Sequence, residues 1–385
     1  MNVSSIKDCY GCGVCTMACN KKIIDIRLND DGFYEPFISN INNCTNCGLC
    51  IEVCAYSHEK LSLEKTQNLS YAAWSNDSVI RHKCSSGGIS FEIGKTLIEQ
   101  GYKVCGVKYS IENNRAEHYI ASTTYELFPS IGSKYIQSYT VDGFKAIKRN
   151  ERYLITGTPC QIDSFRRYIQ KFKKEENFIL MDFFCHGVPS MLLWQKYLLW
   201  VESKTGKINH VSWRNKFNGW HDSWAMAIKG EKGCLKSKLS QGDMFYKLFL
   251  SDTCLGKACY TKCKYKYNKS AADIRIGDLW GQIYKDNQEG VSAVIAITEK
   301  GNAVLKQCNI TLEEHDFEIV AEGQMKKMPP VMKSHIRIIQ SLKNKSHAIT
   351  VTYAELNKIK KREGFKRNLK HPFKTLKNII RKLWR

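Results

Sequence analysis

Apolar residues in the middle of the chain fall into short runs that alternate with helical patterns. Residues 152–156 and 178–184 are apolar runs of the kind found in buried strands. A helical pattern of apolar residues follows each of them, and another runs from Ile89 to Ile98. Further strands are predicted at 104–109, 118–122, 273–278 and 290–298. Strand–loop–helix units in this order predict an α/β body.

The rest of the chain divides around this body. Residues 23–41 read as short strands on either side of the turn signal Asn29-Asp30-Asp31-Gly32. Residues 65–80 are predicted to be a connector. We therefore expect domains at 1–64, 70–150 and 151–320, followed by a basic, partly amphipathic tail at 325–385. The predicted fold is an α+β module in front of an α/β body, with a basic helical C-terminal tail.

The first 54 residues carry eight cysteines in two copies of one spacing, C-x-x-C-x-x-C-x-x-x-C. This spacing holds two 4Fe-4S clusters in bacterial-type ferredoxins, where the fourth cysteine of each run ligates the other cluster. We therefore assign one cluster to Cys9, Cys12, Cys15 and Cys54, and the other to Cys44, Cys47, Cys50 and Cys19. A zinc site needs four ligands, usually in two pairs, and does not account for the third cysteine of each run. Residues 1–64 are thus predicted to be a dicluster ferredoxin-type domain that transfers single electrons.

Composition favours metal over disulfides for these thiols. The chain has 17 cysteines in 385 residues, and its N-terminus shows no apolar run that would act as a secretory signal. A reducing, cytoplasmic location is therefore expected. No apolar segment is long enough to span a bilayer. Neither a zinc-finger spacing nor an RNA-binding aromatic signature is found, so nucleic acid is not an expected partner.

Five of the nine cysteines after Cys54 are candidates for a further cluster. Cys160 and Cys185 follow the predicted strands at 152–156 and 178–184, where ligand sites of open α/β sheets gather and where a thiol is expected to lose its proton readily. Cys254, Cys259 and Cys263 form a short group further on. We predict a third 4Fe-4S cluster on Cys160, Cys185, Cys259 and Cys263, with Cys254 in reserve. The alternative is that these thiols are small apolar side chains of the core.

Two short motifs of the body fit a nucleotide-like cofactor. Ser85-Ser86-Gly87-Gly88 precedes a helical pattern, and such a turn presents backbone N–H groups and a positive helix end that suit a phosphate. A plain serine N-cap is the alternative interpretation. Asp278 stands at the end of a predicted strand, where its carboxylate could accept a hydrogen bond from a ribityl or ribose hydroxyl. The alternative is that Asp278 is a turn residue. We find neither a Gly-x-Gly-x-x-Gly fingerprint after a strand nor a Walker sequence.

Six motifs occur in one order along the chain. They are Ser-Ser-Gly-Gly at 85–88, Gly-Thr-Pro-Cys-Gln at 157–161, Cys-His-Gly-Val-Pro-Ser at 185–190, Arg-Asn-Lys-Phe-Asn-Gly-Trp at 214–220, the cysteine pair at 259–263 and Gly-Asp-Leu-Trp-Gly at 277–281. This order resembles the beta-subunit family of coenzyme F-420 hydrogenases and dehydrogenases. The resemblance covers residues 1–310, with the ferredoxin module fused in front as in bacterial members found among polysaccharide-biosynthesis genes. It implies an FAD, a 4Fe-4S cluster close to it, and a redox reaction at the flavin.

The resemblance also implies roles for single residues. The expected contacts of the FAD phosphates or isoalloxazine are Ser85, Ser86, Gly87, Gly88, Gly157 and Thr158, and those of its other end are Asp278 and Trp280. His186, beside the predicted ligand Cys185, is the candidate proton donor to a reduced substrate, with a structural hydrogen bond as the alternative. Residues 70–150 are then the N-terminal flavoprotein domain, and 151–320 the flavin and iron–sulfur domain.

Together these features predict an iron–sulfur flavoprotein oxidoreductase. Electrons would enter from reduced ferredoxin or a similar low-potential donor at 1–64, pass through the clusters to FAD and reduce an organic substrate, with polysaccharide biosynthesis as the expected setting. The first alternative is an electron-transfer subunit of a larger coenzyme F-420-type hydrogenase or dehydrogenase, without a substrate of its own. The second is a ferredoxin-headed binding protein whose flavin site has decayed.

The C-terminal tail holds much of the net charge. Residues 358–385 contain twelve Lys or Arg and a single acid, Glu363, and so carry half of the net charge of +22. One helical face of the tail collects Phe373, Leu376, Ile380, Leu383 and Trp384. A basic amphipathic helix is attracted to an anionic membrane surface, so peripheral contact with the inner membrane face is expected. A disordered basic tail is the alternative.

Deleting residues 370–385 should release the protein from vesicles that contain anionic lipid, because the deletion removes both the basic charge and the apolar face. Co-sedimentation with vesicles measures this, with neutral vesicles and the full chain as references. The shortened chain should keep its iron. If it sediments with anionic vesicles as well as the full chain does, the tail is not the membrane contact.

Overall fold

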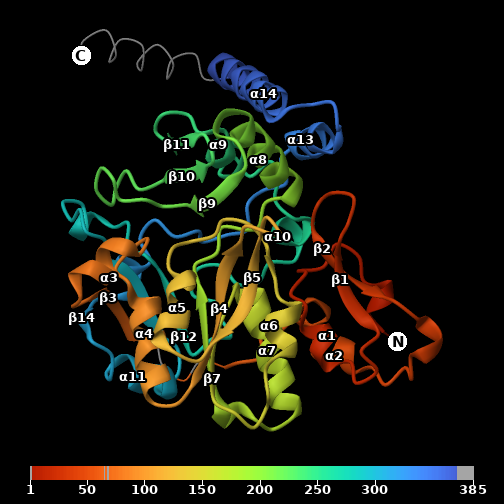
Figure 1. The fold of residues 1–385 in the computed structure, drawn as a ribbon, viewed down its shortest axis with the longest axis vertical. Helices are drawn as coiled ribbons and strands as arrows, with labels where there is room; N and C mark the ends of the chain where they lie inside the picture. Colours follow the sequence, from red (N-terminus) through yellow and green to blue (C-terminus); the bar gives the residue numbers. More distant parts are fainter. Residues whose placement is uncertain (1, 65, 67–68, 371–385) are drawn as a thin grey trace.

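Three sheets build the molecule: a two-stranded hairpin, a nine-stranded sheet and a three-stranded sheet. The computed structural model describes residues 2–64, 66 and 69–370, so the predicted amphipathic helix at 373–384 lies outside the described residues. The N-terminal module lies beside the large sheet, and the three-stranded sheet lies with the C-terminal helices at the opposite end from the loop below β7 (Figure 1). Among the described residues, no helix combines the length and apolar character needed to cross a bilayer.

The N-terminal module places two short helices around a hairpin. Its elements are α1 (Val14–Ala18), β1 (Ile24–Leu28), β2 (Tyr34–Ile38) and α2 (Leu49–Glu52). The strands pair antiparallel. The Asn29 side chain accepts hydrogen bonds from the backbone N–H groups of Asp31 and Phe33, which closes the turn between them. The predicted short strands and their turn are confirmed.

The body is built on a nine-stranded mixed sheet with the order β14-β3-β13-β12-β8-β7-β4-β5-β6. Its strands are β3 (Leu69–Ser75), β4 (Lys103–Ser110), β5 (Arg115–Ala121), β6 (Ser138–Tyr139), β7 (Tyr153–Thr156), β8 (Phe178–Phe183), β12 (Ile274–Asp278), β13 (Ser292–Ala296) and β14 (Ile310–Glu314). β4, β7, β8 and β12 run parallel, and β3 points the same way because two antiparallel pairings separate it from β12. The carboxyl ends of these strands therefore meet at one edge. The α/β body is confirmed, and the ranges 70–150 and 151–320 share this one sheet.

The prediction that residues 65–80 form a connector is wrong. This range contains β3, which lies between β13 and β14. The strand has little local signal, because Ala72 and Ala73 are poor strand formers and its apolar run is short. It forms since strands on both sides supply its hydrogen bonds and cover both of its edges. Tertiary pairing therefore outweighs local propensity in this segment.

Helices cover both faces of the large sheet. They are α3 (Ser78–Lys83), α4 (Ile89–Glu99), α5 (Thr124–Leu127), α6 (Val141–Lys145), α7 (Pro159–Lys171), α11 (Glu299–Leu305) and α12 (Phe317–Val320). On one face, α4 and α11 share a core with Leu154 and Ile179. On the other face, α6, α7 and α1 of the N-terminal module pack on the alternate strand residues Tyr153, Ile155 and Phe178. The module thus shares a hydrophobic core with the body.

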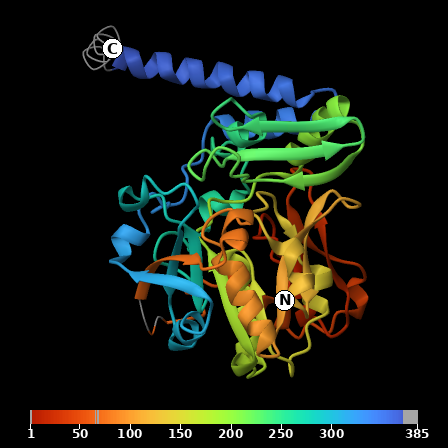
Figure 2. The ribbon, with the colours of Figure 1, turned by 60° about the vertical axis from the view of Figure 1, so that its left-hand side comes forward.

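The remaining layer is a three-stranded antiparallel sheet with helices around it (Figure 2). It comprises α8 (Met191–Thr205), β9 (Ile208–Ser212), β10 (Ala225–Gly230), β11 (Gly233–Lys238), α9 (Met244–Phe249), α10 (Lys257–Thr261), α13 (Ser334–Lys343) and α14 (Ile349–Lys370). Aromatic rings fill its core, where Trp194 contacts Tyr197, Trp213 and Phe245 at centroid distances between 5.0 and 5.9 Å. Figure 2 shows α14 running across the outer side of this layer.

A buried ion pair joins two central strands to the loop after α10. Arg275 on β12 donates to both carboxylate oxygens of Asp182 on β8, each at 2.7 Å, and both side chains are almost fully enclosed. Arg275 also donates to the backbone carbonyls of Tyr265 and Tyr267. The pair therefore fixes where the segment after Cys263 crosses the sheet.

Asp182→Asn should lower the free energy of unfolding by about 3–5 kcal/mol, because it leaves the Arg275 guanidinium buried without a counter-charge. Urea unfolding under anaerobic conditions, followed by tryptophan fluorescence, measures the change. Lys148→Ala is the control, since it removes an exposed pair with Glu151 and should cost less than about 1 kcal/mol. An unchanged urea midpoint for Asp182→Asn would contradict the importance given to this pair.

Candidate functional site

Four N-terminal thiols line one small cavity. Cys9, Cys12, Cys15 and Cys54 surround a space of about 20 Å³. This is the set that the spacing assigns to one cluster, and its fourth member comes from the other cysteine run. Burial raises the pKa of Cys12 to about 11, and the nearby Cys54 adds to the rise. Cluster assembly must therefore displace protons from these thiols.

The other four N-terminal thiols lie nearer to solvent. Cys47 is exposed, Cys19 and Cys44 are half-buried, and Cys50 is buried. Burial, and then the neighbouring Cys47 and Cys19, raise the pKa of Cys50. This second set is the one that the spacing assigns to the other cluster, and it forms the exposed end of the module.

The thiols of the protein are spread more widely than ligands of a single ion. Within the described part of the chain, no group of three or more His, Cys, Asp or Glu side chains is gathered closely enough to hold one metal ion. Thiolates around a 4Fe-4S cube stand farther apart than those around one ion, because the cube lies between them. The wide spacing is therefore compatible with cubes.

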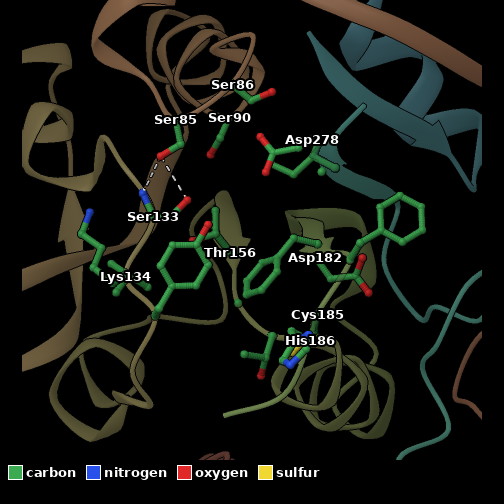
Figure 3. Close-up of a pocket in the computed structure, with 18 of the residues that line it drawn as sticks. Ser85, Ser86, Ser90, Ser133, Lys134, Thr156, Asp182, Cys185, His186 and Asp278 are labelled. Atoms are coloured by element: carbon green, nitrogen blue, oxygen red, sulfur yellow. Dashed lines mark hydrogen bonds between the residues drawn. The ribbon is translucent and has the colours of Figure 1, made fainter. Parts of the chain in front are cut away.

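A large cavity opens at the edge of the sheet where β3, β7, β8 and β12 end (Figure 3). Its volume is about 470 Å³, within the usual range for a cofactor or small-ligand pocket. Sequence-predicted residues on its wall are Ser85, Ser86, Gly88, Gly157, Thr158, His186, Asp278 and Trp280. The structure thus brings together motifs from widely separated parts of the chain.

Helix α4 directs its first turn at this cavity. Its N-cap is Gly88, with φ of 88°, and no side chain caps the helix. The alternative interpretation of the serines as plain N-caps is therefore wrong. Ser85 Oγ instead accepts hydrogen bonds from the backbone N–H and the hydroxyl of Ser133, as Figure 3 shows, and Ser86 donates to the carbonyl of Val291. Because Gly88, Ile89 and Ser90 line the cavity, this end of the helix suits an anionic group.

Gly87 was predicted to contact the cofactor, but it does not line the large cavity. It is packed between β3 and β13, where a side-chain carbon would lie 2.4 Å from the carbonyl oxygen of Ala73. Its backbone N–H donates to Ser292 Oγ at 3.0 Å. Glycine is needed at this position for close packing, not for contact with a ligand.

Arg214 is the main residue of the cavity region that sequence reasoning missed. Its buried guanidinium donates to Asp278 Oδ2 at 2.8 Å and to the hydroxyl of Tyr135 at 3.1 Å. Burial alone would lower the pKa of Arg214, but the Asp278 carboxylate outweighs it and holds the pKa above its usual value. Asp278 is therefore anchored by a buried cation, which leaves its other oxygen for a ligand. The sequence motif at 214–220 was the available signal, but it did not reveal this pairing.

Trp280 extends the same wall of the cavity. Its ring stacks on Trp220 with centroids 5.0 Å apart and planes 7° apart. The Arg214 guanidinium lies over the Trp280 ring at 5.0 Å from its centroid. These contacts hold the tryptophan in place, so it gives the cavity a flat apolar surface next to Asp278.

His186 lies on the cavity wall beside Cys185, as Figure 3 shows. Its Nε2 is 2.8 Å from Asp252 Oδ1, and the two groups form an ion pair when the ring is protonated, although neither atom has a hydrogen-bond partner of good geometry. The ring also meets Phe249 edge-on. The proposed proton donor and the alternative structural role are both compatible with this position.

A second cavity collects the four body cysteines predicted to hold the third cluster. Cys160, Cys185, Cys259 and Cys263 line a space of about 60 Å³. They come from the start of α7, the loop after β8, α10 and the loop after α10. Cys254, the predicted reserve, lies elsewhere: it is fully buried in the aromatic core and donates towards the carbonyl of Leu248.

These body thiols do not lose their protons as readily as the sequence predicted. Burial raises the pKa of Cys259 to about 12, and it raises that of Cys160 well above its usual value. Neighbouring thiols of the same group add to both shifts. The enclosed position of the cavity, which the sequence does not reveal, is the reason for this difference.

The two cavities share a wall. Cys185 and Lys266 line both of them. Lys266 Nζ donates to the backbone carbonyls of Cys185 and His186 at 2.6 and 2.9 Å. The cavity of about 60 Å³ is also lined by Cys9 and Tyr10, so it lies between the N-terminal module and the large cavity. The cysteine cavity thus lies between the N-terminal module on one side and the large cavity on the other.

Both parts of the chain match known protein families. Residues 150–319 match the family that describes the C terminus of the "Coenzyme F420 hydrogenase/dehydrogenase, beta subunit". Over these residues the body is similar to this beta-subunit family. Residues 8–57 match the family described as "4Fe-4S dicluster domain", which confirms that the N-terminal module is an iron–sulfur domain. The protein is therefore an iron–sulfur electron-transfer protein related to the F420 hydrogenase beta subunit.

The chain is also similar to a solved hydrogenase structure. A chain of the F420-reducing NiFe hydrogenase complex from Methanosarcina barkeri is 18% identical to it. The alignment covers 78% of the sequence described above and 94% of the hydrogenase chain, with a TM-score of 0.44. No curated protein matches the sequence.

Cys259→Ala should remove the iron of about one cube while leaving that of the N-terminal module, because it deletes one wall thiol of the 60 Å³ cavity. Iron and sulfide analysis of anaerobically purified protein measures the loss. Cys254→Ala is the matched control and should retain all iron. Unchanged iron in Cys259→Ala, or an equal loss in Cys254→Ala, would contradict the ligand set.

Proposed function

We propose that this protein is an iron–sulfur flavoprotein oxidoreductase. Single electrons enter from reduced ferredoxin or a similar low-potential carrier at the N-terminal module. They pass through two clusters there and a third on Cys160, Cys185, Cys259 and Cys263 to FAD in the large cavity, and the flavin reduces an organic substrate. The observation that carries the proposal is the series of sites, in which the cysteine cavity shares walls with both the module and the large cavity.

The residues of the large cavity fit an FAD. The uncapped end of α4 offers backbone N–H groups to the phosphates, next to Ser85 and Ser86. Thr158 belongs to a capping box at the start of α7, so the Gly157–Thr158 backbone is held rigid beside the same space. At the other end, Asp278 offers a carboxylate oxygen to a hydroxyl or N–H group. A bound flavin would supply the step from single electrons to a hydride equivalent.

Charge around the cavity supports a cofactor whose ring system is uncharged. Asp182 is neutralised by Arg275, and Asp278 is paired with Arg214. Lys134 donates to four backbone carbonyls, and burial lowers its pKa to about 7. Each of these wall charges is therefore already satisfied by the protein. Such a wall leaves no unpaired charge beside an uncharged flavin ring, while the phosphates would lie at the end of α4.

We assign the substrate to polysaccharide biosynthesis, on the resemblance to bacterial members with a fused ferredoxin module. His186 is the proposed proton donor, since it lies on the wall of the large cavity next to Cys185 and close to Asp252. The basic C-terminal segment would bring the protein to the inner membrane face, where lipid-linked sugars are found.

Protein purified without oxygen should contain about twelve irons and one FAD per chain, because three cubes and one flavin site are proposed. Reduced ferredoxin should bleach the flavin absorbance. Eight irons and no flavin would contradict the proposal and favour the decayed binding protein.

Turnover separates the two redox alternatives. Oxidation of the reduced flavin by a small organic acceptor, with the isolated chain, supports an enzyme with its own substrate. Flavin that is reoxidised only after a partner protein is added would show an electron-transfer subunit instead.

A further inference from the structure

Tyr10 lies at the junction between the N-terminal module and the body. It directly follows Cys9, which is assigned to the first cluster. Tyr10 lines both the cavity of Cys9, Cys12, Cys15 and Cys54 and the cavity of the four body cysteines. Tyr10 therefore touches the two sites between which an electron has to cross from module to body.

The hydroxyl of Tyr10 makes a hydrogen bond across this junction. It donates to the backbone carbonyl of Lys262 at 2.5 Å. That carbonyl carbon is bonded to the nitrogen of Cys263, the next residue and a wall thiol of the body cavity. The path from Cys9 to Cys263 thus consists of covalent bonds and a single hydrogen bond.

A second hydrogen bond from a cluster thiol of the module into the body gives a longer route. Cys12 Sγ donates to Ser164 Oγ at 3.3 Å. Ser164 lies about one helical turn beyond Cys160 along α7, so an electron following bonds would have that further turn to cross. The Tyr10 contact is therefore the shorter of these two hydrogen-bonded routes.

Aromatic rings fill the space on both sides of Tyr10. Its ring meets Tyr56 edge-on at 5.2 Å and Tyr265 edge-on at 5.8 Å. Tyr56 follows Cys54 by two residues, and Tyr265 follows Cys263 by two residues. Each ring is thus attached to the chain close to a thiol of one of the two sites, and Tyr10 lies between them.

We propose that Tyr10 electronically couples the first N-terminal cluster to the third cluster. This inference rests on the proposed function, because it requires the third cluster. One electron leaves the reduced first cluster, which is oxidised, and reaches the third cluster, which is reduced. No bond is made or broken, no proton moves, and the phenol itself is neither oxidised nor reduced. Tyr10 is a positioning residue whose hydroxyl bridges the two sites.

Tyr10→Phe tests the proposal, because it removes the hydroxyl and keeps the ring. The matched control is Tyr56→Phe, whose hydroxyl makes no hydrogen bond to any residue that the structure describes. The unchanged protein and the two variants are each mixed with dithionite in the absence of oxygen, and samples are frozen at millisecond intervals. Electron paramagnetic resonance then follows the reduction of the separate clusters, and iron content and cluster spectra are compared at equilibrium.

We expect Tyr10→Phe to keep about twelve irons and the equilibrium spectra, while electron arrival at the third cluster slows several-fold. Tyr56→Phe should match the unchanged protein. Equal rates in all three proteins, each with twelve irons, would overturn the role of Tyr10 and leave the proposed function standing. Loss of iron in Tyr10→Phe would show a structural role instead and also overturn it. Eight irons in the unchanged protein would remove the third cluster, and with it both proposals.

Discussion

The structure depends on the rigid attachment of the N-terminal module to the body. Asp163 on α7 is the centre of this attachment, since its enclosed carboxylate accepts hydrogen bonds from the backbone N–H of Ser62 at 3.0 Å and the hydroxyl of Tyr265 at 2.8 Å. Lys264 and Arg167 balance its charge. A single carboxylate therefore ties together the end of the module, the helix that begins at Pro159 and the segment after Cys263. Electron transfer between separate sites requires this kind of fixed spacing, which a flexible linker would not provide.

The large sheet fixes the positions of the site residues within the body. Because β3, β7, β8 and β12 end at one edge, the loops that follow them bring distant motifs to a common wall. The Asp182–Arg275 pair, in turn, holds the segment after Cys263 against this edge. The position of the third set of thiols thus follows from strand order and from one buried ion pair. No short stretch of sequence contains that information.

This distinction explains what could be predicted from the sequence. Within the module, ligand spacing is a local property: a cube accepts thiols only at certain separations, so the runs at 9–19 and 44–54 already indicate two clusters. The body strands at 153–156 and 178–183 carry strong apolar runs and were also predictable. β3 was not, because its alanines form a strand only where β13 and β14 pair with it. The sequence predicted the same role of ligand contact for Gly87 and for the two serines before it. In the structure the serines line the large cavity, whereas Gly87 is packed between β3 and β13.

Electrostatic partners were the least predictable part of the site. The Arg214–Asp278 pair joins residues 64 positions apart, and neither residue shows locally that the other will neutralise it. The protonation of the thiols after the predicted strands was equally hard to predict. Their position near a helix start favoured the thiolate, but burial raises the pKa of Cys160. Burial is a property of the whole fold, so it reverses expectations drawn from a loop alone.

The central claim is that a third cube lies between the dicluster module and the large cavity. Anomalous X-ray scattering at the iron absorption edge, from crystals grown and frozen without oxygen, locates iron directly. The account predicts three separate iron sites, the third enclosed by Cys160, Cys185, Cys259 and Cys263. Iron at the two N-terminal sites alone, in crystals whose N-terminal sites are fully occupied, would contradict it.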